Sequence, residues 1–598
     1  MNDAPDTASG AARQSWRAAS CIFGLSVAAA SAALIAPETA GWGLYGLDLA
    51  LAAAGFVLTR QLLAGEGGVR GGLAVAAPAA LWAVPALALV GVVVLLAGLF
   101  LLPPADLRNQ AWTALWTAVG LSGGELLKQG WAQAVGGELL WHGFITGVAA
   151  QLAVGWALVL LALRALKRER WTGLVLILGM AAALAVRLWL EARGATLQVF
   201  YLAPPRAGVF FIGAFAAVVI REGSLRGGEG WIGAGARLSA FALPFWLWLW
   251  PLLLLPRMIL ARSLHPLESA AAVLVAAGLA VATELWVSRP LRRRLEGRPV
   301  RALIVCGVLL AGPATASAAL FALDGLPGRA SDAIRTEEAA SQARAPLQAL
   351  CHTEGVEVPA AAACTVPSGR TADGVLWGNS HASHLSPALL DWAAARGHAV
   401  RQATKSGCLP LIGRGSGLVD AGCARFNQLS IEEWGRSPPE LILVGAGWTV
   451  VLEQVPGDDR TQLETLDRNL RATLALLRAR VGAETRIVLL GTTPDYGFAP
   501  AACHARRGFL RLDTGRCDAA VPANAALMAA VDDRLARIAA ETPGVILFRP
   551  SEALCEDGLC RTRGADGPWY SDRSHMTEAG GRAQTAALSA VLDRAETP

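Results

Sequence analysis

This sequence of 598 residues lacks the local signals of several large protein classes. It contains no GxxxxGK(S/T) loop that would cradle a phosphate group, and no Cys-x-x-Cys pair of the kind that ligates zinc. It shows no metal-binding box and no recognisable nucleic-acid-binding module. The sequence therefore gives no indication that the protein binds a nucleotide through a P-loop, binds zinc through paired cysteines, or binds nucleic acid.

The first half of the chain is instead dominated by apolar runs. Between residue 17 and about 323, Ala, Leu, Val, Gly and Trp form nine segments, each near the length that crosses a bilayer. The nine segments are 17–36, 44–63, 79–102, 143–165, 172–191, 207–220, 237–256, 268–287 and 302–322. A further patch at 111–122 is short, and we expect it to be re-entrant. Because a signal peptide supplies only one such segment, this pattern predicts a polytopic all-α membrane domain over residues 1–323.

Basic residues mark one side of the predicted membrane domain. They occur between the apolar segments in four groups: Arg60 and Arg70; Lys167, Arg168 and Arg170; Arg221 and Arg226; and Arg289, Arg292, Arg293, Arg294, Arg298 and Arg301. The positive-inside rule makes these loops cytoplasmic. Alternation then places the N-terminus inside and everything after residue 323 outside. The net charge of +5 reflects these loops and does not indicate nucleic-acid binding.

Cysteine usage agrees with that topology. Two of the ten cysteines, Cys21 and Cys306, lie in predicted spans, and the other eight fall in the C-terminal part. Neighbours in the sequence suggest the pairs Cys351–Cys364, Cys408–Cys423, Cys503–Cys517 and Cys555–Cys560. Disulfides at this density indicate an oxidising compartment, here a bacterial periplasm. Zinc binding is the alternative, and it is disfavoured because the spacings suit loop closure better than a metal site.

The C-terminal part alternates strand and helix patterns. Residues 324–345 are small and polar and predict a linker, after which a domain spans 346–598. Strands are expected at 374–378, 398–403, 440–445, 485–490 and 544–548, and helices at 384–396, 424–435, 459–481, 522–541 and 577–593. Crossovers of this length predict a parallel sheet covered on both faces, an α/β/α domain.

Two short motifs in this domain carry the residue types of serine catalysis. Ser380 directly follows the strand at 374–378, where parallel sheets gather their reactive groups. Asp572 and His575 share one short loop near the C-terminus. A serine becomes a nucleophile when an imidazole takes its proton, and a carboxylate fixes the tautomer of that imidazole. Helix capping by the serine and the aspartate is the structural alternative.

The same motifs resemble those of the SGNH hydrolase/acyltransferase family. Gly378-Asn379-Ser380-His381 is similar to its first block, and Asp572-Arg573-Ser574-His575 to its last. Ser406–Pro410 resembles the second block, and Leu443–Trp448 occupies the third. The resemblance covers about 346–598 and implies a flavodoxin-like fold with a parallel sheet.

The resemblance also implies a role for each matching residue. Ser380 would be the nucleophile, His575 the general base and acid, and Asp572 the carboxylate that orients the histidine. The backbone N–H groups of Ser380 and Gly407 would stabilise the oxyanion.

Two departures from the family pattern weaken this assignment. Asn379 replaces the usual aspartate, which keeps an acceptor oxygen for the turn but removes its charge. In the third block, Gly447 and Trp448 stand without the family's asparagine or arginine, so one oxyanion donor is unaccounted for. Loss of one such donor can cost about 10²–10³ in rate.

The membrane half resembles the acyltransferase-3 family, which passes acyl groups across membranes and is often fused to SGNH domains. The clearest match is 46–59, and 104–107, 142–151, 247–251 and 287–290 also fit. The polar residues of the family are mostly replaced: Ala28 and Leu249 stand where histidines are expected. Asp48, His142 and Gln151 survive, and we interpret them as buried structural groups. This half is therefore predicted to be a degenerate acyl-transfer scaffold.

Together these features predict a membrane-anchored SGNH serine O-acyltransferase or acetylesterase that acts on an extracytoplasmic polysaccharide or lipopolysaccharide. The alternative is a catalytically impaired glycan-binding or assembly subunit of a cell-surface polysaccharide system. No tightly bound cofactor is expected; the acyl donor, acetyl-CoA or a group delivered by a separate membrane protein, would be a substrate. The expected partners are the glycan, membrane lipid and that donor protein. The expected location is the bacterial inner membrane, with the C-terminal domain in the periplasm.

Overall fold

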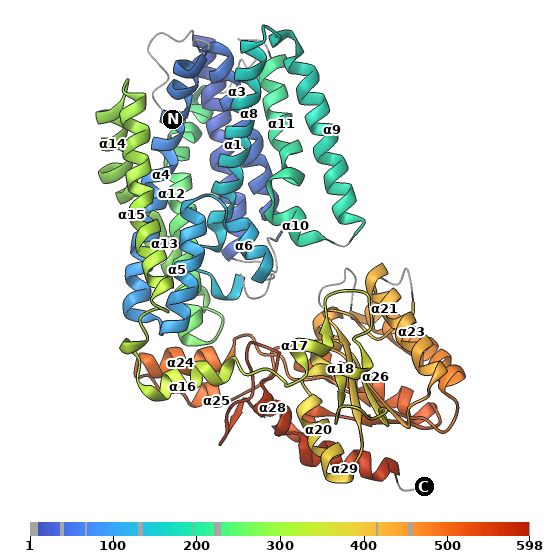
Figure 1. Cartoon of the computed structure of the whole chain (residues 1–598). Coiled ribbons are helices and arrows are strands. Elements are labelled where there is room, and N and C mark those ends of the chain that lie inside the picture. Colours follow the sequence, from blue (N-terminus) through green and yellow to red (C-terminus); the bar gives the residue numbers. More distant parts are fainter. Residues whose placement is uncertain are drawn as a thin grey trace. The chain divides into compact units, whose positions relative to one another are not determined.

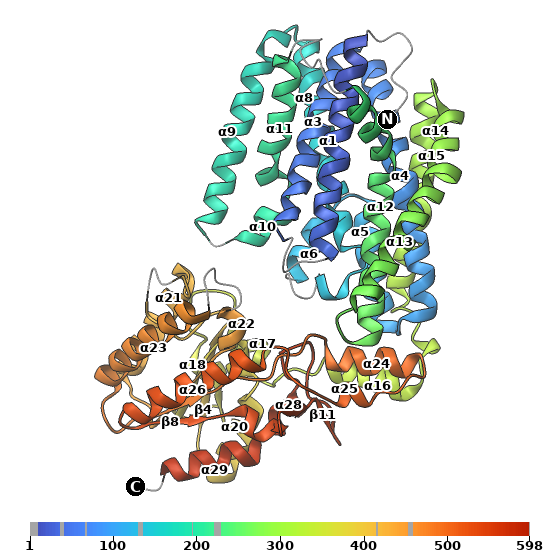
Figure 2. The ribbon, with the colours of Figure 1, turned by 180° about the vertical axis from the view of Figure 1, so that it is seen from behind.

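The computed structural model describes residues 10–35, 41–65, 68–129, 135–193, 195–220, 229–413, 417–452 and 459–596. The chain divides into two compact units, Met1–Arg329 and Ala330–Pro598. The first unit is helical and the second is an α/β domain (Figure 1; Figure 2 shows the reverse view). The fold class expected from the sequence is confirmed.

Helices of 6 to 34 residues build the first unit. They are α1 Gly10–Ile35, α3 Gly46–Ala64, α4 Gly68–Leu101, α5 Pro104–Ala118, α6 Ser122–Gln129, α8 Phe144–Ala165, α9 Thr172–Glu191, α10 Thr196–Tyr201, α11 Ala203–Val219, α12 Glu229–Leu260, α13 Pro266–Ala282, α14 Arg289–Leu295 and α15 Pro299–Ala322. Shorter helical turns are η1 Gly41–Tyr45, η2 Trp141–Gly143, η3 Glu169–Trp171, η4 Thr283–Ser288 and η5 Pro327–Arg329.

Over their described residues, the nine apolar segments coincide with these helices and helical turns. Among the described residues, seven helices are long and apolar enough to cross a membrane. The apolar parts of the other two, Ala19–Ile35 and Ala203–Val219, are shorter than a usual span. The patch at 111–122 falls mostly on α5, which ends at Ala118.

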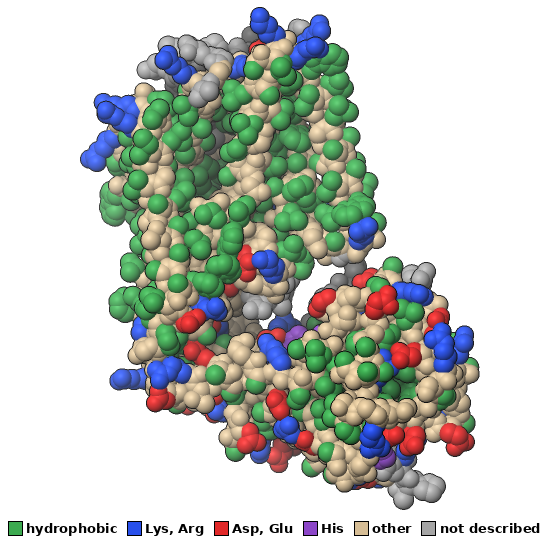
Figure 3. Space-filling model, in the orientation of Figure 1, with side chains coloured by type: hydrophobic (Ala, Val, Ile, Leu, Met, Phe, Trp, Pro, Cys, Tyr) green, Lys and Arg blue, Asp and Glu red, His purple; other side chains and the backbone are tan. Residues whose placement is uncertain are grey.

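The surface of the helical unit is unusually apolar. Large hydrophobic side chains point outward, such as Leu158, Leu274 and Trp286, which are 62%, 72% and 78% exposed. They spread over much of this unit, and Lys and Arg side chains gather at the end that carries α14 and the α8–α9 connection (Figure 3). Such a surface is unfavourable in water and suits contact with lipid.

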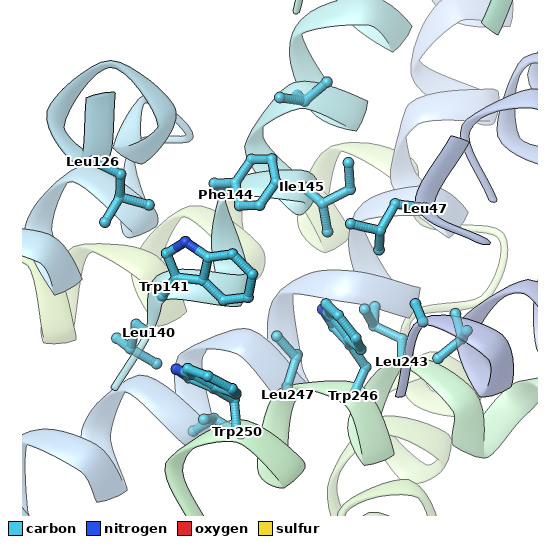
Figure 4. Packing of buried hydrophobic residues seen from close by; sticks show 14 of the residues in the cluster. Leu47, Leu126, Leu140, Trp141, Phe144, Ile145, Leu243, Trp246, Leu247 and Trp250 are labelled. Atoms are coloured by element: carbon cyan, nitrogen blue, oxygen red, sulfur yellow. The ribbon is translucent and has the colours of Figure 1, made fainter. Parts of the chain in front are cut away.

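Tryptophans fill part of the interior of this unit. Trp141, Trp246 and Trp250 are buried and lie among leucines (Figure 4). The ring centroids of Trp141 and Trp250 lie 5.2 Å apart. The indole N–H of Trp141 donates to the Tyr201 hydroxyl at 2.8 Å, and the indole N–H groups of Trp246 and Trp250 donate to backbone carbonyls. Packing therefore explains these tryptophans.

The surviving polar residues of the membrane half lie in different surroundings. Asp48 accepts from the Arg206 guanidinium at 2.5 Å, and the ring of buried His142 lies 3.1 Å from the carbonyl of Leu247. Gln151 is exposed, which corrects its expected burial. The predicted basic residues Arg221 and Arg226 lie outside the described residues.

A largely parallel sheet forms the centre of the second unit. Its order is β1-β4-β3-β5-β6-β8, and β2 pairs with β4 in the antiparallel sense. The strands are β1 His352–Thr353, β2 Thr365–Val366, β3 Gly374–Gly378, β4 Val400–Lys405, β5 Leu441–Gly445, β6 Arg486–Leu490 and β8 Val545–Phe548. The five strands expected from the sequence match β3, β4, β5, β6 and β8, whereas two-residue β1 and β2 are too short to give a sequence pattern.

Successive side chains of each strand point to opposite faces of the sheet and pack into two separate hydrophobic cores. On one face, Trp377 and Val444 pack with α21 Ala421–Arg436, α23 Asp459–Val481 and α26 Ala525–Glu541. On the other face, Leu376 and Leu443 pack with α20 Ser386–Arg396 and α29 Thr585–Glu596. Because neighbouring residues of one strand serve opposite cores, β3 and β5 read as unbroken apolar runs.

Shorter elements complete this unit. They are α16 Asp332–Ser341, α17 Gln348–Cys351, α18 Ala361–Cys364, α19 Ser380–Ser383, α22 Trp448–Leu452, α24 Pro500–Phe509, α25 Gly515–Asp518, α27 Pro550–Leu554, α28 Glu578–Arg582, β7 Ala519–Ala520, β9 Cys555–Glu556, β10 Leu559–Arg561, β11 Arg563–Gly564 and β12 Gly567–Pro568.

Residues 324–345 do not form an open linker. They contain α16, which packs against α24 and belongs to the second unit. The Glu337 carboxylate on α16 is buried and lies 3.1 Å from the Arg563 guanidinium. The small, polar composition that suggested a linker instead suits a short amphipathic helix held by an ion pair.

The structure contains four disulfides, and their pairing is the one expected from the sequence. Cys21 and Cys306 are free. Each bond closes a loop of 15 residues or fewer, so each acts on one local segment of the C-terminal unit.

Replacing both Cys408 and Cys423 by serine should lower the thermal unfolding midpoint of the full-length protein in detergent. The bond closes a 15-residue loop, and a cross-link of that length stabilises by about 3 kcal/mol. Tryptophan fluorescence would follow unfolding. Cys21→Ser, at a free cysteine, is the control and should leave the midpoint unchanged. An unchanged midpoint in the double variant would show that this bond does not stabilise the domain.

Candidate active site

The site begins at the carboxyl end of β3, where the chain turns sharply. Gly378 has φ of +151°, a conformation that side-chain-bearing residues rarely adopt. A Cβ atom at this position would lie 1.6 Å from the carbonyl oxygen of Gly445, because β3 and β5 are neighbours here. Only glycine fits this close approach, and the turn aims the next residues away from the sheet.

Asn379 fixes the turn that presents the serine. Its Oδ1 accepts two backbone N–H groups, from His381 and from Gly447, each at 3.0 Å. It is the N-cap of α19, and Ser380 is the first residue of that helix. The amide oxygen thus performs the turn role expected of it without a charge.

Three side chains far apart in the sequence meet at this point. Ser380 Oγ lies 2.9 Å from His575 Nε2, and His575 Nδ1 lies 2.7 Å from Asp572 Oδ2. The structure therefore brings together all three residues that the sequence nominated, in the order of a serine–histidine–carboxylate triad. The caps of the adjacent helices are Asn379 and Thr577, which argues against capping as the role of Ser380 and Asp572.

The Asp572 carboxylate is held in its ionised form. Partial burial alone would raise its pKa, but the His575 ring and the backbone N–H groups of Ser574 and His575 together lower it well below its ordinary value. Oδ1 accepts those two N–H groups at 2.9 and 2.7 Å, which leaves Oδ2 for the imidazole. The charge beside Nδ1 keeps the proton there and leaves Nε2 free to accept from serine.

An ion pair that the sequence did not reveal anchors this loop. Arg573 donates to both oxygens of Asp495 at 2.7 Å, and the N–H of Tyr496 donates to the carbonyl of Arg573 at 3.0 Å. Asp495 is fully buried in the segment that follows β6. Its burial raises its pKa despite the adjacent guanidinium. One feature of the sequence could have indicated this ion pair. Asp495 follows a predicted strand, and the carboxyl ends of parallel strands lie at the same edge of the sheet as the site.

The oxyanion candidates lie in different settings. Gly407 follows β4 with φ of +62°, and β4 pairs directly with β3. Among the described residues, no hydrogen bond engages the backbone N–H of Ser380 or of Gly407. The N–H of Gly447 is bound to Asn379, and Trp448 is fully buried with its indole N–H on the Leu490 carbonyl. Gly447 and Trp448 thus support the site rather than supply a free donor.

Two further histidines lie behind the triad. The ring centroids of His381 and His384 lie 5.0 and 5.2 Å from that of His575. Burial, aided by the nearby His575, lowers the pKa of His381 to about 3. Burial likewise holds the pKa of His384 well below its usual value. Both rings are therefore neutral, and no cluster in the described part of the chain has the geometry of a metal site.

Comparison with known proteins found one family model and one solved structure that resemble part of this chain. Residues 350–589 match the family described as an SGNH domain fused to AT3 domains. The chain is also similar to the solved periplasmic domain of the lipopolysaccharide acetyltransferase of Salmonella ser. Paratyphi A, with 15% sequence identity and a TM-score of 0.32. That similarity covers 44% of this chain and 97% of the other. No curated protein matches the sequence.

Gly378→Ala should destabilise the C-terminal unit and disrupt the site, because its methyl group would overlap the Gly445 carbonyl. Gly397→Ala is a matched control, since Gly397 also has positive φ (+76°) but no atom lies within 4 Å of the added Cβ. We expect about 1 kcal/mol of loss at Gly397 from backbone strain and several-fold more at Gly378. Thermal unfolding measures both, and equal losses would contradict the steric argument.

Proposed function

Because residues 350–589 form an SGNH domain of the kind fused to AT3 domains, we propose that this protein is a membrane-anchored serine O-acyltransferase or O-acetylesterase. Its substrate would be an O-acyl ester on an extracytoplasmic polysaccharide or lipopolysaccharide. The observation that carries the proposal is the chain of two short contacts from Ser380 through His575 to Asp572.

In the first half-reaction, Ser380 Oγ attacks the carbonyl carbon of the acyl donor. His575 Nε2 takes the hydroxyl proton as the bond forms, and Asp572 stabilises the resulting imidazolium at Nδ1. The carbonyl oxygen becomes an oxyanion, which the backbone N–H groups of Ser380 and Gly407 would stabilise. When the tetrahedral intermediate collapses, His575 returns the proton to the departing group and leaves an acyl ester on Ser380.

In the second half-reaction, the acyl group passes to an acceptor hydroxyl. His575 removes the proton from water or from a sugar hydroxyl, whose oxygen attacks the acyl carbon, and Ser380 Oγ recovers the proton as it leaves. If water is the acceptor, the enzyme acts as an esterase; if a sugar hydroxyl is the acceptor, it acts as a transferase. The balance depends on how well the bound glycan excludes water.

The membrane half would anchor the enzyme and does not supply the acyl chemistry itself. Ala28 and Leu249 stand at the positions where the acyltransferase-3 resemblance expects histidines. Of the surviving polar groups, Asp48 is engaged by Arg206 and His142 lies against the Leu247 carbonyl, which suits structural roles. The acyl donor would therefore come from a separate membrane protein, or the enzyme would act simply as an esterase.

A glycan-binding subunit without catalysis is the second candidate. It is favoured by Gly447, which has no side chain to donate and whose backbone N–H is already bound to Asn379 Oδ1, so this position supplies no oxyanion donor. Retained glycan affinity together with an unreactive Ser380 would support this candidate over the enzyme.

A fluorophosphonate probe should label Ser380 in the full-length protein, and labelling should disappear in Ser380→Ala. The neighbouring Ser386→Ala is the control and should label normally, since that buried serine lies outside the triad. Mass spectrometry of the modified peptide reads the result. Equal labelling of wild type and Ser380→Ala would refute the serine mechanism.

Asp572→Asn should lower turnover of p-nitrophenyl acetate by about 10³–10⁴-fold with little change in KM. An amide can hold the ring, but its NH₂ group donates to Nδ1 and leaves the ring proton on Nε2, so the histidine can no longer accept the serine proton. Steady-state kinetics on the full-length protein measure the effect. Wild-type turnover in this variant would remove Asp572 from the mechanism.

The proposed location is the bacterial inner membrane, with the N-terminus in the cytoplasm and the C-terminal unit in the periplasm. The apolar helices, the basic loops and the four disulfides support it. Trypsin added to spheroplasts should cleave the C-terminal unit and spare the loop at Lys167–Arg170. Cleavage of that loop in sealed spheroplasts would reverse the proposed orientation.

A further inference from the structure

We infer that His384 is a positioning residue that holds the His575 loop in register with Ser380, by accepting a backbone N–H through an uncharged ring nitrogen. This inference rests on the proposed function, because it assigns His384 a part in the serine reaction. His384 touches none of the reacting atoms and acts only through the loop.

His384 is hydrogen-bonded to the backbone of Ser380 and to the backbone of the residue that follows His575. Its backbone N–H donates to the Ser380 carbonyl at 3.2 Å, so it lies one helical turn beyond the nucleophile. Its Nδ1 accepts the backbone N–H of Met576 at 3.3 Å, and Met576 directly follows His575. The side chain is 2% exposed. One buried residue thus joins the start of α19 to a loop almost two hundred positions later.

The Met576 contact completes the set of bonds that fix the loop. The N–H and hydroxyl of Ser571 both donate to the His575 carbonyl, at 2.8 and 3.2 Å. Asp572 accepts the His575 N–H. His384 accepts the next N–H along the chain, which would otherwise be a buried donor without a partner. Its loss should let the imidazole move relative to Ser380 Oγ.

The arrangement requires Nδ1 of His384 to be unprotonated. The groups that face this ring are His381 on α19, His575 on the loop, His352 on β1 and Arg344 ahead of α17. All four are basic, so each opposes a positive charge on His384, as does its burial. The acceptor therefore persists while His575 takes up and releases its proton during turnover.

His384→Leu and His384→Asn separate the acceptor from mere packing. Asparagine Oδ1 lies at the same number of bonds from Cα as Nδ1 of histidine, so it can accept the Met576 N–H, whereas leucine cannot. In the full-length protein with p-nitrophenyl acetate, we expect His384→Leu to lower kcat about 10- to 100-fold, since displacements near 1 Å cost that much. KM should change little, and His384→Asn should stay within about threefold of wild type.

Hydrogen exchange of the peptide that contains Met576 gives a readout independent of activity. Its amide should be protected in wild type and His384→Asn and should exchange faster in His384→Leu. His398→Leu, at a partly exposed histidine away from the triad, is the control and should match wild type in both measurements. Thermal unfolding midpoints identify any variant that fails to fold. If His384→Leu does not fold, the kcat and the Met576 exchange of His384→Asn still test whether an acceptor at this position is sufficient.

The outcomes distinguish this inference from the proposed function. If wild type neither turns over the ester nor reacts with the fluorophosphonate, the function fails. If wild type is active and His384→Leu keeps its kcat, or if His384→Asn loses as much as leucine, the positioning role is wrong. Unchanged exchange at Met576 in His384→Leu would also overturn it.

Discussion

The site depends on the parallel register of four neighbouring strands. Gly378 pairs with Thr404 on one side and with Gly445 on the other, and Gly445 pairs with Leu490. The four carboxyl ends therefore meet at one edge of the sheet. Ser380 and Gly407 arrive there from β3 and β4, and Gly447 and Asp495 follow β5 and β6. A shift of one residue in any pair would separate these groups.

Backbone hydrogen bonds carry most of the organisation around the triad. Asn379 gathers the N–H groups of His381 and Gly447, Asp572 gathers two within its own loop, and His384 accepts one more. Side chains thus fix main-chain segments that come from different parts of the fold. Within this network the Asp572 carboxylate beside His575 is ionised. The two buried histidines next to His575, His381 and His384, are neutral.

The two units differ in where they place their apolar side chains. In the helical unit, apolar residues face outward as well as inward, because the surrounding medium is suited to them. In the C-terminal unit, apolar side chains form two cores on the two faces of the sheet, and four disulfides close its loops. The composition change near residue 323 reflects this change of surroundings, although the boundary between the two compact units falls after Arg329 in the sequence.

Local patterns in the sequence predicted the apolar helices of the first unit, the five central strands, the cysteine pairs and the candidate residues Ser380, Asp572 and His575. These predictions use the periodicity and spacing of residues that are close together in the sequence, so a short segment of the chain is enough to make each one. The tertiary structure alone decided that Asp495 clamps Arg573, that Gly447 serves Asn379 and that α16 packs on the domain. Those contacts join segments tens or hundreds of residues apart, so their energy depends on distances that no local pattern encodes.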